Sequence, residues 1–398
     1  MMTKLLLARW IGVAAMWLVF SYSFTDPNLT LVNHSLYVSL QEWLWQHLFA
    51  NKQLLTTLFF LFVFILFFLY FSSIKKYEKI LGYPIVLVGI FILLTLSYPA
   101  LSHDIFNYIF NAKIVWVYQQ NPHEVAALSF PDDVWTRFMH NTHTPAPYGY
   151  GWTLISLAPF SLGLSKFMPT FFLFKFFSFF SYISFFVLFT KKVTLSRYTL
   201  LFLLNPLVLI EILSSAHNDL WMMLPAVGAI MLLMKNRLSK KNSILALLLL
   251  TVSISIKLVT VVLLPIYLLR LAVEHWNHPL RSLYMQSLPL FSSLILFLPL
   301  MTERSQQFLP WYLAWSLCWL PLFAYIQHPV LKKLGIYWST VLITFSASSL
   351  FRYLPWIYEN GYSPEIQLQQ RLITWIPGLI ACVLICMHWA HQRQTTAS

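Results

Sequence analysis

The chain carries a carboxylate, Asp104, in the segment Ser-His-Asp-Ile-Phe-Asn-Tyr, which directly follows a long apolar run. At the boundary between water and membrane a carboxylate keeps its charge, because it avoids the penalty of full burial in hydrocarbon. It can also reach the head group of a lipid-linked substrate and act on a hydroxyl group as a general base. We therefore expect a base at Asp104, with His103, Asn107 and Tyr108 beside it. The alternative is that Asp104 only caps the helix that follows.

A second polar group surrounds Glu211, which lies inside the apolar run 200–213. Asn218 follows seven positions later and shares a face with Glu211 if the helix continues. His217 and Asp219 flank Asn218, and the next apolar run begins directly after them. We expect these polar residues to belong to a site, although Asn218 or Asp219 could equally cap the next helix.

Two more polar groups interrupt the later apolar segments. Lys257 is isolated among apolar neighbours, and Trp311 and Tyr312 follow a proline near the end of another run. An isolated lysine in such a run reaches toward water, pairs with a carboxylate such as Glu211, or holds an anion. The topology derived below brings all four polar groups toward one face, and this convergence is the main argument from the residues for a site.

The composition indicates a polytopic membrane protein, with 59% hydrophobic and only 10% charged residues among 398. Apolar runs of about 15 to 24 residues recur along the chain, each long enough or nearly long enough to cross roughly 30 Å of hydrocarbon as a helix. We expect one all-α membrane domain, residues 1–398. The net charge of +13 gathers in short clusters beside apolar runs, as topology determinants do, so nucleic-acid binding is not expected.

The basic clusters predict which parts of the chain lie outside. Clusters at 4–9 and 75–79 flank the first two apolar runs, and a third run then leads into the Asp104 segment. If basic clusters are cytoplasmic, residues 101–151 form an outer loop that carries Asp104, and residues 352–371 form a second outer loop over the same face.

The alternation of sides gives about twelve crossing segments under two assumptions. Residues 152–165 must lie along the outer surface, and 243–272 must form two short helices that meet near Lys257. The spacing of apolar residues over 104–118 predicts an amphipathic helix in the membrane interface. The Phe-rich run 171–186 is typical of a helix surface that faces lipid.

A metal site is a weaker alternative. His140 and His143 have helical ligand spacing, but nearby prolines disfavour a helix there. His103, His123, His217 or Asp219 could complete such a site, yet no motif fixes a ligand set. We expect no metal ligands.

At these residues the chain resembles the GT-C superfamily of membrane glycosyltransferases, and within it the bacterial polyprenyl-phosphate-mannose-dependent alpha-mannosyltransferases. Each match is short, and the order and spacing of the matches from about residue 100 to 315 carry the likeness. The matching elements are Asp104–Tyr108 with Lys113 and Asn121-Pro122; Pro147–Trp152; Asn205-Pro206-Leu207 with Glu211 and His217-Asn218-Asp219; Lys257 with Pro265; and Pro310–Leu313. One departure is Tyr150, which stands where the family's Tyr-Gly-Pro-Leu-Trp element has proline.

The resemblance implies an inverting glycosyltransferase that moves a sugar, mannose by the family likeness, from a polyprenyl-phosphate carrier to a glycolipid or polysaccharide. Asp104 would be the catalytic base, and Lys257 the first candidate for binding the leaving phosphate. Candidates behind Lys257 are Lys113, Arg304, Arg352 and Arg371. The remaining predicted substrate contacts are His103, Asn107, Tyr108, Tyr148, Glu211, His217, Asn218, Asp219, Trp311 and Tyr312, with His217 and Asp219 orienting hydroxyl groups or Lys257.

The expected setting is a bacterial plasma membrane, with the site on its extracytoplasmic side and no cofactor or required metal. Two other classes of protein would also explain the composition. A secondary transporter would bury Glu211 and Lys257, although such proteins usually show repeated halves, and none is visible here. A membrane protein that binds lipid-linked glycans without chemistry would leave the ordered motifs unexplained.

Overall fold

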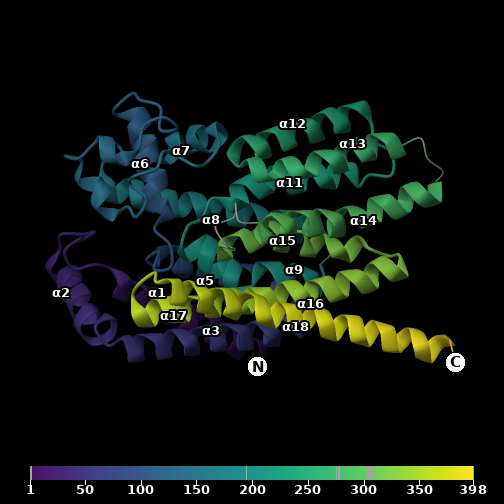
Figure 1. Ribbon diagram of the computed structural model, residues 1–398, viewed down its shortest axis with the longest axis horizontal. Coiled ribbons are helices and arrows are strands. Elements are labelled where there is room, and N and C mark those ends of the chain that lie inside the picture. The colour runs from purple at the N-terminus through teal and green to yellow at the C-terminus, as the bar shows by residue number, and fades with distance from the viewer. Residues whose placement is uncertain (1, 194, 275, 277, 303–307, 398) are drawn as a thin grey trace.

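Long helices running side by side make up most of the protein (Figure 1). The computed structural model describes residues 2–193, 195–274, 276, 278–302 and 308–397, without the side chains of 278 and 393–397. Every regular element in these ranges is helical. The predicted all-α class is therefore confirmed for the described chain.

The helices follow one another with short connections in most of the chain. The first half contains α1 Met2–Ser21, α2 Ser35–Leu44, α3 Lys52–Ile74, α4 Tyr77–Leu81, α5 Pro84–Leu96, α6 Asp104–Trp116, α7 Tyr150–Leu162, α8 Phe167–Lys191 and α9 Arg197–Leu203. The second half contains α10 Pro206–Val208, α11 Asp219–Leu233, α12 Lys240–Ile256, α13 Leu264–Val273, α14 His278–Phe297, α15 Ala314–Leu317, α16 Pro329–Phe351, α17 Tyr353–Glu359 and α18 Pro364–Ala397.

Within the described ranges, seven helical segments are long and apolar enough to cross a membrane. They are Met2–Phe24, Lys52–Ile74, Phe167–Lys191, Arg197–Ser214, Pro279–Met301, Pro329–Glu359 and Pro364–Gln392. Three shorter apolar segments are Pro84–Leu96, Asp219–Leu233 and Leu258–Val273. The larger count of about twelve crossings stays a prediction.

The α12–α13 segment has the predicted break near Lys257. Helix α12 ends at Ile256, Lys257 is extended (φ −144°, ψ 127°), and a 3₁₀ turn, Leu258–Leu263, leads into α13. The chain therefore reverses at Lys257, so that α12 and α13 run in opposite directions (Figure 1). The basic connection between α11 and α12 lies at the other end of these helices, away from α6.

The helix through Glu211 does not continue to Asn218, contrary to the expectation of a shared face. Helix α9 ends at Leu203 ahead of Pro206, which cannot donate a backbone hydrogen bond inside a helix. A π-helical turn, Leu209–Ser214, follows, and Ala216 then adopts the left-handed region (φ 60°) before α11 begins at Asp219. The polar groups meet because the chain turns, and π-turns and left-handed residues of this kind often occur at functional sites.

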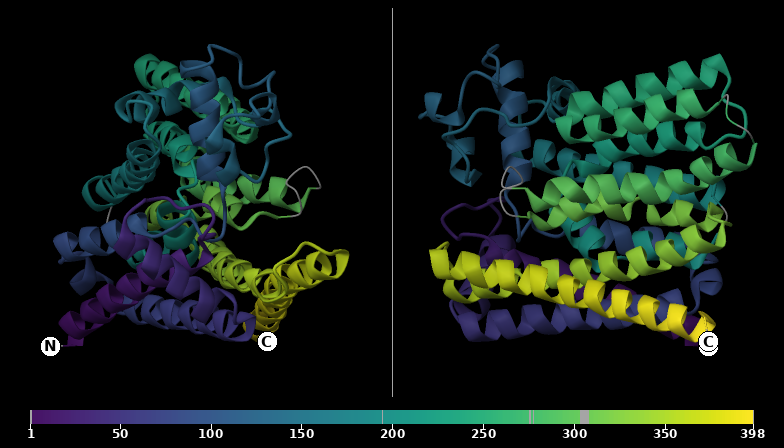
Figure 2. Two further views of the ribbon diagram at one scale, coloured as in Figure 1. Left: turned by 90° about the vertical axis from the view of Figure 1, so that its left-hand side faces the viewer. Right: turned by 45° about the vertical axis from the view of Figure 1, so that its right-hand side comes forward.

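Two of the predicted surface segments are more deeply packed than expected. Helix α6 runs across the long helices in both views of Figure 2, but it is buried around most of its circumference, while Trp116 at its end is 52% exposed. In α8, the Phe-rich segment buries half of its apolar window and includes the fully buried Lys175, so it does not simply face lipid. The predicted second outer loop, 352–371, is mostly helical because it contains α17 and the start of α18.

A close backbone approach joins the outer loop to the Lys257 break. The amide of Gly149 donates a hydrogen bond to the carbonyl of Ile256 at 2.9 Å. A Cβ atom at Gly149 would lie 2.0 Å from the carbonyl oxygen of Ser255, and one at Gly151 would lie 2.2 Å from the Ser255 hydroxyl. Helix α7 begins at Tyr150, and the first position of a helix also suits proline, which the Tyr-Gly-Pro-Leu-Trp element carries there. The Tyr150 departure is therefore compatible with the same helix start.

We predict that Gly149→Ala destabilises the protein by about 1–3 kcal/mol, because the added methyl group must displace the backbone at Ser255. Gly89→Ala is the matched control, since no atom lies within 4 Å of its Cβ position. Thermal unfolding of the purified variants measures the difference. Equal midpoints for the two variants would contradict the tight contact.

Candidate active site

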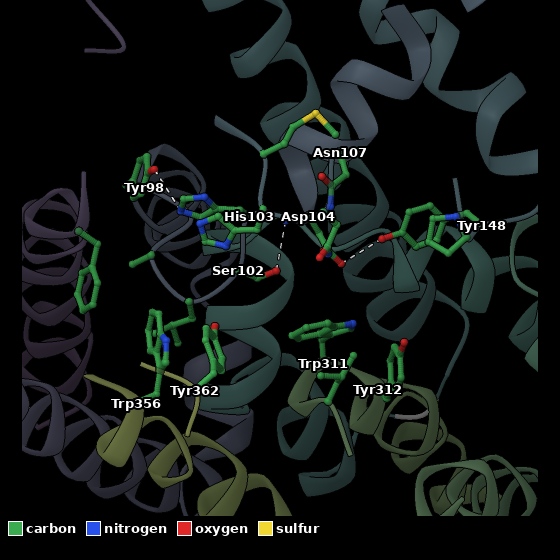
Figure 3. A pocket seen from close by; sticks show the side chains of 18 of the residues that line it. Tyr98, Ser102, His103, Asp104, Asn107, Tyr148, Trp311, Tyr312, Trp356 and Tyr362 are labelled. Carbon is green, nitrogen blue, oxygen red and sulfur yellow. Dashed lines mark hydrogen bonds between the residues drawn. The ribbon is translucent and has the colours of Figure 1, made fainter. Parts of the chain in front are cut away.

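A cavity of about 960 Å³ opens where the outer loop meets the Lys257 break. Its wall contains Asp104 from α6, Tyr148 from the loop, Lys257, and aromatic side chains from the segment before α15 and from α17 (Figure 3). Carboxylate, amine, hydroxyl and aromatic groups thus face one space, as is typical of a small-molecule site. Three of the four predicted polar groups line this cavity, and the fourth, which contains His217 and Asp219, contacts Asp104 and Lys257 from behind the wall.

Asp104 faces this cavity from the first turn of α6. Its Oδ2 accepts a hydrogen bond from the Tyr148 hydroxyl at 3.1 Å and lies 3.6 Å from Nδ1 of His217. His103 occupies the N-cap position without a capping hydrogen bond from its side chain, and the Ser102 hydroxyl accepts a hydrogen bond from the Asp104 amide at 3.3 Å. The capping alternative for Asp104 is therefore wrong, because its carboxylate contacts groups on other segments.

His217 connects Asp104 to a second buried carboxylate. Its Nε2 lies 3.4 Å from Oε2 of Glu211, whose other oxygen accepts a hydrogen bond from the hydroxyl of Tyr353 at 2.8 Å. The imidazole stacks on Trp311, with ring centroids 4.0 Å apart and an interplanar angle of 16°. His217 and Glu211 are fully buried, so the ring is fixed behind the cavity wall and cannot rotate freely.

Lys257 pairs with Asp219 and not with Glu211, the partner that the sequence suggested. The Lys257 Nζ atom lies 2.8 Å from Oδ1 of Asp219, which also accepts a hydrogen bond from Nε1 of Trp315 at 2.5 Å. Asp219 is buried at the N-terminus of α11, where the helix dipole favours an anion. The Lys257 amine remains at the cavity, 5.4 Å from the ring centroid of Tyr148 and 5.6 Å from that of Tyr312.

Burial dominates the electrostatics of the groups at the cavity. It raises the pKa of the Asp104 carboxyl above its usual range, whereas the charge of Lys257 and the hydrogen bond from Tyr148 act in the opposite direction. Burial and the charge of Lys257 hold the pKa of His217 well below its usual range, so the ring is neutral at pH 7. A neutral imidazole carries one N–H group and can donate to only one of its two carboxylate neighbours.

Other predicted contacts line the cavity or support its wall. His103 stacks on His140 with centroids 3.9 Å apart, and burial lowers its pKa to about 3, which keeps it neutral. Asn107 faces the cavity, and its side-chain oxygen has no partner among the described residues. Tyr108 is buried behind Tyr148, at a centroid distance of 5.1 Å.

Several predicted residues do not reach the cavity. Lys113 pairs with Asp133 at 2.5 Å in the outer loop. Asn218 is buried behind the wall, and neither of its side-chain polar atoms has a partner in the described chain. Arg304 lies outside the described residues. Within the described ranges, no three His, Cys, Asp or Glu side chains are placed to hold one metal ion.

Three residues that the sequence analysis did not select complete the site. Trp315 and Tyr353 hold Asp219 and Glu211 by the hydrogen bonds given above. Lys175, buried in α8, donates hydrogen bonds to the carbonyls of Leu213 and Ser214 at the end of the π-turn. Lys175 showed the same signal as Lys257, an isolated lysine in an apolar run, whereas a tyrosine or tryptophan in an aromatic-rich chain gives no comparable signal.

We predict that Asp104→Asn raises the thermal midpoint at pH 8 by on the order of 2 °C. The folded-state pKa of Asp104 is raised, so its ionised form costs stability above that pKa, and the variant removes this cost. The gain should shrink as the pH falls through the raised folded-state pKa, and it should vanish below the usual carboxyl pKa of about 3.9, where the group is protonated in both states. Asp132→Asn, in the exposed part of the same loop, is the control. Destabilisation at pH 8 would contradict the predicted environment of Asp104.

Comparison with known proteins identifies a family. Residues 9–273, about two thirds of the chain, match the family model described as alpha-(1->6)-mannopyranosyltransferase, N-terminal domain. No curated protein and no solved structure matches the chain. The matched segment contains Asp104, His217 and Lys257. The resemblance to membrane mannosyltransferases is thereby confirmed, and the chain belongs to the alpha-(1->6)-mannopyranosyltransferase family of glycosyltransferases.

Proposed function

We propose that this protein transfers mannose from a polyprenyl-phosphate carrier to a hydroxyl group of a glycolipid or polysaccharide, with inversion at the anomeric carbon. The observation that carries the proposal is the cavity position of Asp104, hydrogen-bonded by Tyr148 and 3.6 Å from His217, in a chain of a mannosyltransferase family. A carboxylate so placed suits a general base.

The proposed reaction is a direct displacement. Asp104 removes the proton from the acceptor hydroxyl as that oxygen forms a bond to the anomeric carbon, and the bond from that carbon to the phosphate oxygen breaks. The electron pair of the broken bond leaves with the carrier phosphate. The transition state has oxocarbenium character, so the ionised carboxylate must lie within about 3 Å of the attacking oxygen.

The neighbours of Asp104 suit this role. Lys257 lowers the pKa of Asp104 against the effect of burial, and Asp219 holds the Lys257 amine in place. Tyr148 and His217 approach Oδ2, which leaves Oδ1 to receive the proton. His217 is a positioning residue here, fixed by its stack on Trp311.

A lipid-linked donor fits the rest of the chain. Its sugar would enter a cavity lined by Tyr312, Trp311 and Trp356, while its lipid stays in the bilayer. Phosphate is a tolerable leaving group once protein cations surround it, so we propose that no metal is required. The basic α11–α12 connection lies at the end of the bundle away from α6, the helix that places Asp104 at the cavity, which supports an extracytoplasmic site by the positive-inside rule.

Asp104→Asn should lower the transfer rate by about 10²- to 10⁴-fold, because the amide cannot accept the hydroxyl proton. Product formation from mannosyl-phosphoryl polyprenol, followed by mass spectrometry, measures the rate. Binding of the donor should persist, and Asp132→Asn serves as the control from the same loop. Turnover of the Asp104 variant at the wild-type rate would remove this residue from the chemistry.

Lys257→Gln should shift the acid limb of the pH–rate profile to higher pH. Removal of the positive charge leaves burial to raise the pKa of Asp104 further, so a higher pH is needed to ionise the base. The profile of kcat/KM against pH measures the shift, and Lys113→Gln, which removes an amine outside the cavity, is the control. An unshifted acid limb would contradict the coupling of Lys257 to Asp104.

A further inference from the structure

Three cavities of the described structure are neighbours, because each shares lining residues with the next. The active-site cavity shares Leu309 and Tyr362 with a second cavity of about 680 Å³. That second cavity shares Met301 and Trp375 with a third of about 720 Å³. The three cavities together therefore extend from the catalytic carboxylate to the outer surface of the helix bundle.

We infer that the second and third cavities bind the carrier lipid, with its phosphate at Arg352 and Arg371 and its isoprenoid chain between α14 and α18. This inference rests on the proposed function. It adds the residues that hold the donor, and most of them lie beyond the segment that matches the family.

The second cavity has the charge that a phosphate requires. Arg352 and Arg371 both line it, together with Gln367 and Gln370, and none of its described lining residues is acidic. Arg352 is 93% buried, and one of its Nη atoms donates a hydrogen bond to Thr374 Oγ1 at 3.3 Å. A guanidinium has five N–H donors in a planar fork, so donors remain to bind phosphate oxygens in pairs.

The third cavity has the shape and chemistry of a lipid-chain groove. Aliphatic and aromatic side chains from α13, α14, α16 and α18 line it almost completely. Leu298, Phe291 and Leu379 in this lining are half exposed or more, so the groove is open along its side. The lining of α14 and the turn after it, from Tyr284 to Met301, extends for about 25 Å at helical rise.

The order of the cavities identifies the occupant as a sugar-bearing prenyl phosphate. The chain in the groove, the phosphate at the arginines and a sugar beyond Tyr362 would follow one another in the order in which they are bonded. An ordinary phospholipid could fill the groove and the arginine cavity but would bring no anomeric carbon to Asp104. Lys257 is less suited to the phosphate, because Asp219 already pairs with it at 2.8 Å.

The test measures equilibrium binding of radiolabelled farnesyl phosphate to the full chain in phosphatidylcholine nanodiscs. Binding should weaken about 10- to 100-fold in each of three variants, Arg352→Gln, Arg371→Gln and Leu298→Trp. The first two remove a charged group that donates hydrogen bonds to the phosphate, and the third fills the groove. Arg237→Gln and Leu248→Trp are matched controls at exposed positions outside these cavities. If Arg352→Gln does not fold, Arg371→Gln at an exposed side chain gives the same test, and Arg352→Lys should restore part of the affinity.

Competition and transfer separate the possible outcomes. Farnesol, inorganic phosphate and phosphatidylglycerol should each compete at least tenfold less well than unlabelled farnesyl phosphate. Equal competition by phosphatidylglycerol, or wild-type affinity in both arginine variants, would overturn the inference. If the variants keep wild-type binding while the wild type transfers mannose, only this site is refuted. If binding shows the expected dependence but no prenyl-phosphate sugar is a donor, the proposed function fails and the lipid site stands.

Discussion

The ion pair between Lys257 and Asp219 is the interaction on which the site depends, because it joins two breaks in the helical chain. Asp219 begins α11 after the π-turn and the left-handed Ala216, and Lys257 lies in the extended link between α12 and the turn before α13. The close contact of Gly149 with Ser255 packs the outer loop against the second of these breaks, the one at Lys257. The carboxylate, hydroxyl and amine groups therefore meet only because the helices end where they do.

The polar groups gathered at the site lower the stability of the folded protein. Asp104, His217 and Glu211 are brought together in buried surroundings, and several of their polar atoms lie beyond ordinary hydrogen-bond distance. Burial raises the pKa of Asp104 and lowers that of His217, which favours neutral forms. An enzyme that needs a base of moderate strength gains from this environment, since a raised pKa makes a carboxylate a stronger proton acceptor near neutral pH.

Much of the site could be predicted from the sequence, because charged residues in apolar runs are costly and therefore informative. Asp104, His217, Asp219 and Lys257 were found in this way, and so was the break at Lys257. The expectation that Glu211 and Asn218 share a helix face was wrong. It assumed a continuous helix, and residue periodicity does not predict a π-turn. The sequence also could not predict which side chains pair. The ion pair of Lys257 with Asp219 and the hydrogen bond from Tyr353 to Glu211 both join residues that are distant in sequence.

The central proposal is that Asp104 takes the proton from an acceptor hydroxyl group that attacks the anomeric carbon of a sugar bonded to the carrier phosphate. An experimental structure of the Asp104→Asn variant with mannosyl-phosphoryl polyprenol bound tests this most directly, because the variant should bind the donor without turnover. We predict the anomeric carbon facing the residue 104 side chain, with room for one hydroxyl group about 3 Å from that side chain. A sugar bound remote from residue 104, or turned with its anomeric carbon away from it, would contradict the account.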